Sequence, residues 1–302
     1  MSTGTVHPEL KKTPPKLTMS AWNIRIFRFL LTYLAPKRES SLYVETSTKD
    51  LDGIQLRIHK PKSVEPTSAL LWIHGGGLIV GTPAQDDWRC AQIAERLGVL
   101  VVAIQYRLAP EHVYPAAIDD CFATWMVVQK YAKDLGLNPH KIAIGGASAG
   151  GGLAANLALR IRDAGGIQPV GQLLVYPMLD DRTALRSDVH PKGHFVWNNK
   201  SNMTGWRSYL GIHFNVEKVP KYAVASRHDN LQDLPPVWIG VGTLDLFYDE
   251  DLEYANRVKD SDVPTVLETV EGAYHGFDEI DRASTVSESF MNNMIEFLRP
   301  LL

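Results

Sequence analysis

A serine lies at the centre of a pentapeptide of small residues, Gly146-Ala147-Ser148-Ala149-Gly150, which has the form G-x-S-x-G. The apolar residues 141–144 before it indicate a short buried strand, and residues 150–160 after it indicate a helix packed against a sheet. At such a corner a serine is held on a tight turn with its hydroxyl exposed at the end of the sheet. Small neighbours suit this turn, because larger side chains would collide with the strand and the helix. The pattern predicts that Ser148 is a nucleophile.

A serine hydroxyl is a weak nucleophile at neutral pH, so it needs a base that is held in one tautomer by an acid. Asp245 and His275 each follow a later predicted strand, and the chain order Ser, Asp, His is the one expected for a serine on this kind of turn. Asp249 is an alternative acid, but it begins the next predicted helix, where it would serve as a cap. We therefore predict a proton-transferring triad of Ser148, Asp245 and His275.

A glycine run, His74-Gly75-Gly76-Gly77, follows another apolar strand. Because glycine has no side chain, the backbone N–H groups of this loop can approach a bound oxygen closely. Such a loop after the third strand, with the amide of the residue that follows the nucleophile, here Ala149, binds the oxyanion in acyl transfer. We predict an oxyanion hole formed by Gly75, Gly76, Gly77 and Ala149. A phosphate-binding loop is excluded, since neither glycine run has the form GxxxxGK[ST] or GxGxxG.

Short apolar runs alternate with helical stretches along most of the chain. This alternation predicts an α/β fold with a mostly parallel sheet covered on both faces, and Asp52-Gly53 predicts a hairpin that makes the sheet mixed. The expected strands are residues 42–48, 54–59, 69–73, 99–105, 141–144, 171–176, 237–241 and 264–270. The expected helices between them are residues 86–97, 116–135, 150–164 and 249–259.

Two segments do not follow this alternation. Residues 181–230, called the insertion below, lack a strand pattern and are rich in aromatic residues. An insertion after the carboxyl end of a strand is well placed to cover a site there, although a helical excursion that only stabilises the core is the alternative. Residues 1–20 are expected to be loose, and residues 21–35 are expected to form an amphipathic helix that lies on the protein.

The composition excludes several classes of function. The chain has 302 residues, 45% of them hydrophobic, with a formal charge of -3, so no basic field attracts nucleic acid or an anionic membrane. Cys90 and Cys121 form no metal or disulfide pattern and are expected to be buried. The apolar residues 21–35 are too short for a membrane span, and no signal-peptide pattern is found, so we expect a cytoplasmic protein.

The chain resembles the hormone-sensitive-lipase-like family of carboxylesterases, also called family IV, over residues 70–277. The resemblance rests on these stretches together: residues 74–77, 106–112, 115–120, the Ser148 pentad, the Asp245 loop and residues 275–277. It implies an α/β-hydrolase fold with eight strands and a helical cap. The cap would comprise residues 1–40 and 181–215, and the catalytic core residues 41–180 and 216–302. No metal or organic cofactor is implied, and dimerisation through the edge of the last strand is expected.

The family's roles fall on Ser148, Asp245 and His275 as the triad, and on Gly76, Gly77 and Ala149 as oxyanion donors, with Gly75 shaping the loop. The sequence departs from the family at two positions: Ala147 replaces an acidic residue, and Leu78 replaces an aromatic one. Leu78, Trp197 and Trp206 are candidate pocket residues. We expect Arg107, Glu111 and Asp119 to form a structural ion-pair network.

These expectations describe a serine carboxylesterase that hydrolyses small-molecule esters with short to medium acyl chains through an acyl-enzyme. The alternatives are a deacetylase or amidase that uses the same triad, a lipase that prefers long chains, and a receptor on this fold that binds small molecules without turnover.

Overall fold

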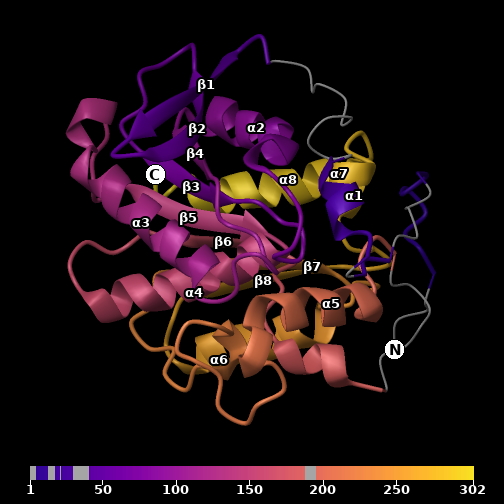
Figure 1. Cartoon of the computed structure of the whole chain (residues 1–302). Helices are drawn as coiled ribbons and strands as arrows, with labels where there is room; N and C mark the ends of the chain where they lie inside the picture. The colour runs from indigo at the N-terminus through magenta and orange to yellow at the C-terminus, as the bar shows by residue number, and fades with distance from the viewer. Residues whose placement is uncertain (1–4, 13–17, 21, 30–40, 188–194) are drawn as a thin grey trace.

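A mixed β-sheet forms the centre of the molecule in the computed structural model, which describes residues 5–12, 18–20, 22–29, 41–187 and 195–302. Within these residues the sheet has eight strands in the order β1-β2-β4-β3-β5-β6-β7-β8 (Figure 1). The strands are β1 (Val44–Leu51), β2 (Ile54–Pro61), β3 (Ala69–Ile73), β4 (Leu100–Ile104), β5 (Ile142–Ala147), β6 (Gln172–Val175), β7 (Val237–Gly242) and β8 (Thr265–Val270). Each expected strand is present, with its ends shifted by a few residues at most.

The direction of the strands agrees with the sequence pattern. Strand β2 pairs antiparallel with both β1 and β4, and all pairs from β4 to β8 are parallel. Strand β3 lies between β4 and β5, with Ile73 opposite Gly146. The loops that follow β3 and β5 therefore leave the sheet side by side, and they carry the glycine run and Ser148 respectively. The α/β fold prediction is confirmed.

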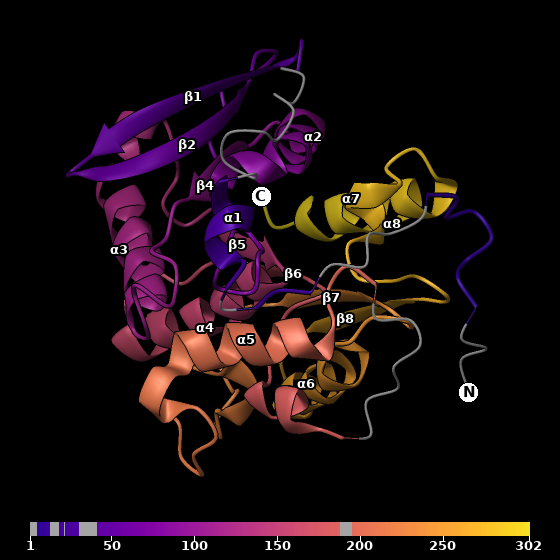
Figure 2. The same cartoon turned by 45° about the vertical axis from the view of Figure 1, so that its right-hand side comes forward.

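Helices cover both faces of the sheet, as Figure 2 shows from a second direction. Helices α2 (Asp87–Leu97) and α8 (Thr285–Leu298) share a core with one face, and α3 (Ala116–Lys130), α4 (Ala149–Ala164) and α6 (Tyr248–Asp260) share a core with the other. Alternate residues of β3 divide between the cores: Leu70 and Trp72 belong to the first, and Leu71 and Ile73 to the second. This is the period of two that a buried strand requires. Both cysteines are free and buried, as expected.

Three of the described helices were not among the expected ones. The insertion contains α5 (Asn199–Leu210), and α7 (Phe277–Ile280) follows His275. Helix α1 (Ile24–Phe29) lies within the helix expected over residues 21–35, of which residues 21 and 30–35 lie outside the described residues. Helix α8 had no counterpart among the expected helices, although it buries Phe290, Met294 and other apolar side chains. None of the helices in the described part of the chain is long and apolar enough to cross a membrane.

The described N-terminal residues are hydrogen-bonded to the rest of the protein, which differs from the expected loose segment. The amide of His7 donates to the Gly272 carbonyl at 2.9 Å, and the amide of Lys11 donates to the carboxylate of Asp281 at 2.8 Å. Further along, the amide of Met19 donates to Ser201 Oγ of α5 at 2.8 Å. The N-terminal segment and the insertion therefore touch each other. Their assignment as one cap, with the boundaries at residues 40, 181 and 215, stays a prediction.

Three charged residues that were expected to form one network instead have separate partners. Arg107 binds Asp120 with 2.8 Å between Nη2 and Oδ1. Glu111 pairs with Arg28 at 2.8 Å, and Asp119 pairs with Arg160 at 2.6 Å. Arg107 and Glu111 lie in the loop after β4, whereas Asp119 lies in the first turn of α3, and each side chain reaches a different neighbour. Their expected role in holding loops agrees with these contacts, but the single network was wrong.

Candidate active site

Ser148 occupies a strained turn between β5 and α4. Its φ of 56° and ψ of -122° lie outside the regions that non-glycine residues usually adopt. The backbone holds this conformation from both sides, since the Ser148 amide donates to the Val175 carbonyl at 2.9 Å and its carbonyl accepts from the Met178 amide at 2.9 Å. A Cβ on Gly150 would lie 2.0 Å from the Ile73 carbonyl oxygen, so this position accepts only glycine. The small residues of the pentapeptide are thus required by close packing.

The side chains of Ser148, His275 and Asp245 form a connected row at the carboxyl ends of β5, β8 and β7. Ser148 Oγ lies 3.0 Å from His275 Nε2, and His275 Nδ1 lies 2.7 Å from Asp245 Oδ2. In the tautomer this row requires, the serine hydroxyl donates to Nε2 and the Nδ1–H donates to the carboxylate. The other carboxylate oxygen, Oδ1, accepts from the Phe247 amide at 3.0 Å, which fixes the orientation of the acid. All three residues are more than nine-tenths buried.

Asp249, the alternative acid, lies elsewhere. Its carboxylate pairs with Arg186 at 3.2 Å, and its side chain is largely exposed. It lies in the first turn of α6, where a negative charge is favourable, but Phe247 occupies the N-cap position. The expected cap role was therefore wrong in detail, because the helix begins at Tyr248, one residue earlier than predicted.

The glycine loop after β3 lies directly against Ser148. A Cβ on Gly75 would be 3.3 Å from Ser148 Cβ, so the backbone of the loop passes next to the serine. Gly76 and Gly77 have φ values of 115° and 59°, and their amides donate to no backbone carbonyl in the described residues. The amide of Ala149 starts α4, where the first N–H groups of a helix have no partner within it. These N–H groups are the candidates for binding an oxyanion.

His74 supports the base of this loop as a neutral side chain. It is completely buried and stacks on Tyr106 with 4.2 Å between ring centroids. Burial lowers the pKa of His74 to about 4, while the contact of its Nδ1 with the Gly75 carbonyl opposes this shift. The Tyr106 hydroxyl donates to the His74 carbonyl at 3.0 Å. Both contacts fix the start of the glycine loop against the core.

The insertion touches the same loop through one aromatic side chain. A Cβ on Gly77 would lie 2.0 Å from Cη2 of Trp197, and a Cβ on Gly205 of α5 would lie 2.6 Å from the Gly77 carbonyl oxygen. Trp197 therefore packs on the loop itself. Trp206 is buried beside Tyr209, with ring centroids 6.2 Å apart, and Leu78 is buried in the core. The assignment of these three residues to a substrate pocket stays a prediction.

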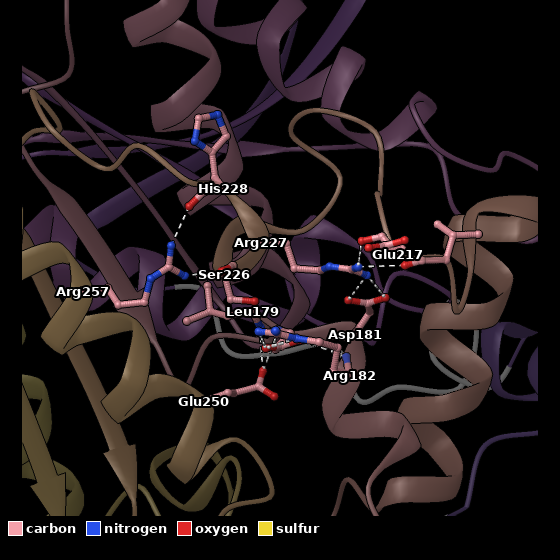
Figure 3. Close-up of polar contacts among 11 residues, drawn as sticks. Leu179, Asp181, Arg182, Glu217, Ser226, Arg227, His228, Glu250 and Arg257 are labelled. Carbon is pink, nitrogen blue, oxygen red and sulfur yellow. Dashed lines mark hydrogen bonds and ion pairs between the residues drawn. The ribbon is translucent and has the colours of Figure 1, made fainter.

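Side-chain ion pairs and hydrogen bonds anchor both ends of the insertion (Figure 3). Arg227 Nη1 lies 3.0 Å from the buried carboxylate of Asp181, and Arg227 Nη2 donates to the Val216 carbonyl at 2.7 Å. Glu250 of α6 accepts from the Leu179 amide at 2.7 Å. Burial raises the pKa of Asp181, although Arg227 opposes the shift. These contacts join the start of the insertion, its end and a core helix.

Arg257 adds a second connection to the end of the insertion. Its guanidinium donates to the carbonyls of Ser226 and His228, and the latter contact is 2.6 Å long (Figure 3). Because each of these contacts needs a charged side chain from a distant part of the chain, sequence periodicity does not reveal them.

Two aromatic residues at the site were missed by sequence reasoning. The ring centroid of Tyr176 lies 4.7 Å from that of His275, and the ring centroid of Phe247 lies 5.3 Å from it. Tyr176 is the last residue of the predicted strand 171–176, and Phe247 lies six residues after the predicted strand 237–241. Their position at the carboxyl ends of parallel strands was the one available signal for both.

Residues 70–279 match the model of a protein family described as an α/β-hydrolase fold. Esterase LipI of Mycobacterium tuberculosis is 35% identical over 208 residues, which cover 69% of this chain and 65% of that protein. Carboxylesterase NlhH of the same organism is 30% identical over 90% of this chain and 88% of its own length. The match to the family model spans all the site residues named above.

Solved structures extend the similarity to the whole chain. A bacterial heroin esterase superposes with a TM-score of 0.88 and 31% identity, covering 99% of this chain and 98% of its own. Esterase LipW from Mycobacterium marinum superposes with a TM-score of 0.86 and 27% identity, covering 99% of both chains.

Proposed function

The chain belongs to the hormone-sensitive-lipase-like family of α/β-hydrolases, and from that premise we propose that it is a serine carboxylesterase that works through an acyl-enzyme. The observation that carries the proposal is the continuous row from Ser148 Oγ through the His275 imidazole to Asp245 Oδ2, with contacts of 3.0 and 2.7 Å. Relatives named as esterases and carboxylesterases support the same reaction class.

In the first half of the proposed reaction, Ser148 Oγ attacks the carbonyl carbon of the ester while His275 Nε2 takes the hydroxyl proton. Asp245 keeps the imidazole oriented and stabilises it when it becomes charged. The amides of Gly76, Gly77 and Ala149 bind the oxygen on which negative charge develops. Loss of one such donor typically costs about 3 kcal/mol of transition-state stabilisation. His275 then protonates the leaving alcohol, so the ester bond breaks and the acyl group stays on Ser148.

In the second half, a water molecule takes the place of the alcohol. His275 accepts a proton from the water, which attacks the acyl-enzyme carbonyl, and the same amides bind the oxyanion again. Collapse of this intermediate releases the carboxylic acid and returns the proton to Ser148. The cycle leaves the protein unchanged.

We expect small-molecule esters with short to medium acyl chains as substrates. Trp197 supports this preference, because its indole lies directly on the oxyanion loop and adds bulk beside the reacting carbonyl. An apolar wall of this kind favours small apolar groups and sets no demand for charge on the substrate.

A series of nitrophenyl esters with increasing acyl length, assayed beside Ser148→Ala, tests the proposal. We expect the highest kcat/KM for short chains and a loss of at least about 10⁴-fold in Ser148→Ala, whose fold should be intact by circular dichroism. Activity that rises steadily to chains of about sixteen carbons would indicate a lipase with lipid contact instead. Matched amide substrates cleaved as fast as the esters would indicate an amidase, and no turnover of any substrate would favour a receptor.

A further inference from the structure

The imidazole of His275 is contacted by two aromatic rings that the proposed reaction does not use. The Tyr176 ring meets it at 4.7 Å between centroids with an interplanar angle of 62°, and the Phe247 ring meets it at 5.3 Å and 85°. Tyr176 follows β6, and Phe247 follows β7, so the rings reach the imidazole from two neighbouring loops. Tilted ring pairs at such distances are attractive, and together they restrict rotation of the imidazole.

The hydroxyl of Tyr176 is anchored by two residues that do not belong to the triad. It donates to Asp278 Oδ1 at 2.9 Å and accepts from Arg89 Nη2 at 3.0 Å. The same Nη2 donates to Asp278 Oδ2 at 2.8 Å, so the three groups close a ring of hydrogen bonds. All three residues are at most 3% exposed. In a buried environment such charge-assisted hydrogen bonds are strong and fix the donor and acceptor geometry.

Burying these charged groups costs desolvation free energy, so the network calls for an explanation. Arg89 is completely buried, and it also lies 3.0 Å from the carboxylate of Glu279. Two nitrogens of its guanidinium, Nε and Nη1, have no hydrogen-bond partner within the described structure. A buried ion pair of this kind is often no more stable than apolar side chains of the same volume. Stability alone therefore explains the network poorly.

The backbone of Tyr176 is constrained as well. Its φ of 36° is unusual for a residue with a bulky side chain. The Tyr176 amide donates to the Gly240 carbonyl at 2.7 Å, while the carbonyl of the preceding Val175 accepts from the Ser148 amide. A strained backbone conformation persists only where the surrounding contacts enforce it, and strained residues are common at functional sites. The position of Tyr176 is thus tied to the nucleophile through the backbone and to the base through the ring.

We propose that Tyr176 is a positioning residue for His275, and that Arg89 and Asp278 hold it in place through its hydroxyl. The ring keeps the imidazole in line with both Ser148 Oγ and Asp245 Oδ2. Phe247 supports the same imidazole by packing, without a hydrogen-bonded anchor. The inference rests on the proposed function, since it concerns the base of the same reaction.

Tyr176→Phe tests the anchor while it keeps the ring. We expect kcat for nitrophenyl acetate to fall about tenfold, because a small displacement of the base weakens the reacting geometry. The rate constant for covalent labelling of Ser148 by an organophosphonate should fall by the same factor, with KM changed by less than about twofold. The control is Tyr254→Phe, which removes another buried tyrosine hydroxyl, one with no hydrogen-bond partner in the described residues. This variant should match the wild type.

Asp278→Asn is measured through the pH profile of the reaction. Within the described residues, Asp245 and Ser148 lie within hydrogen-bond distance of His275, and Tyr176 and Phe247 pack on its ring. Arg89 and Asp278 bind the Tyr176 hydroxyl, and Glu279 pairs with Arg89. Removing the negative charge of Asp278 disfavours a charged imidazole, so the acid limb of the kcat/KM profile should move to lower pH.

Three results would overturn the inference. The first is a Tyr176→Phe protein whose labelling rate constant and kcat both stay within twofold of the wild-type values. The second is a Tyr254→Phe protein that loses as much labelling rate and kcat as Tyr176→Phe. The third is a folded Asp278→Asn protein in which the acid limb of the kcat/KM profile does not move. The labelling rate also separates the two proposals. A wild type that is labelled quickly but hydrolyses no ester contradicts the proposed function, while the ratio between wild type and Tyr176→Phe still decides the role of the tyrosine.

Discussion

The loops at the carboxyl end of the sheet and the insertion that packs on them are positioned by different forces. Ser148 is held by backbone hydrogen bonds to Val175 and Met178 and by glycines that tolerate no Cβ. The insertion is held by charged side chains, above all the pair of Arg227 with the buried Asp181. Backbone contacts survive most substitutions, whereas an ion pair is lost with one residue. Apart from substitutions of these glycines, the geometry of Ser148 should therefore resist mutation more than the position of the insertion does.

The largest expected effect on stability comes from Arg227→Met. The substitution leaves the Asp181 carboxylate buried without its cation, which should lower the free energy of unfolding by about 3–5 kcal/mol. Because burial raises the pKa of Asp181, its folded state binds the proton more tightly than the unfolded chain, and stability decreases as pH rises through the folded pKa. The loss should thus be larger at pH 8 than at pH 5 in urea titrations.

A matched control for that prediction is Arg299→Met, which breaks an exposed pair with Glu296 at 3.2 Å. An exposed pair contributes at most about 1 kcal/mol. If both variants lost the same stability, the insertion would not depend on its buried charge, and the contrast between the two regions would be wrong.

Gly77→Ala tests the contact between the glycine loop and Trp197 of the insertion, and it should act mainly on kcat. The added Cβ would lie 2.0 Å from Trp197 and would sit at a φ of 59°, so the loop or the indole must move. Because Gly77 is a proposed oxyanion donor, displacing its amide should lower kcat by about 10²-fold. Gly166→Ala is the control for positive φ alone, since that glycine has a φ of 84° with no neighbouring atom within 4 Å. The double variant Gly77→Ala/Trp197→Ala should recover part of the lost kcat, because the indole no longer collides with the added Cβ. If kcat did not recover, the defect would lie in the glycine loop itself.

The smallest expected effect for a single residue comes from two buried histidines outside the insertion, His59 on β2 and His74 at the start of the glycine loop. Burial lowers the pKa of both His59 and His74 to about 4, so only the unfolded chain takes up these protons between about pH 6.5 and 4. Their contribution to stability is complete above pH 6.5 and is lost as pH falls through this window, by about 2 kcal/mol for each histidine at pH 5. Urea titrations from pH 7 to 5 should show this loss, and His59→Gln should reduce it by about half. An unchanged slope in that variant would contradict the assignment.

Sequence patterns predicted the sheet well because each strand has its own short-range signal. Residues 69–73 and 237–241 are uninterrupted apolar runs, and the structure places β3 and β7 there. Helix α5 was missed, because its sequence Asn199–Leu210 mixes polar residues and a glycine with its buried aromatic side chains. Helix α8 was also missed, although its apolar residues recur at helical spacing.

The candidate site was predictable to the extent that its residues follow strands in order. Ser148, Asp245 and His275 could be selected in this way, because parallel strands end at one edge of the sheet. Tyr176 and Arg89 could not be selected, since their contact with each other and with Asp278 joins a strand end to two helices that are distant in the chain. The single network expected for Arg107, Glu111 and Asp119 failed for the same reason, because pairing partners are set by distance in space.

The amino-acid sequence by itself determined the positions of the strands along the chain, the tight turn around Ser148 and the residue types available for proton transfer, because these follow from local periodicity and from the steric limits of glycine. Only the tertiary structure decided which side chains meet. It brought Trp197 onto Gly77 and a buried arginine behind the tyrosine that touches His275. Such contacts depend on how elements pack, and packing is a property of the whole chain rather than of any segment.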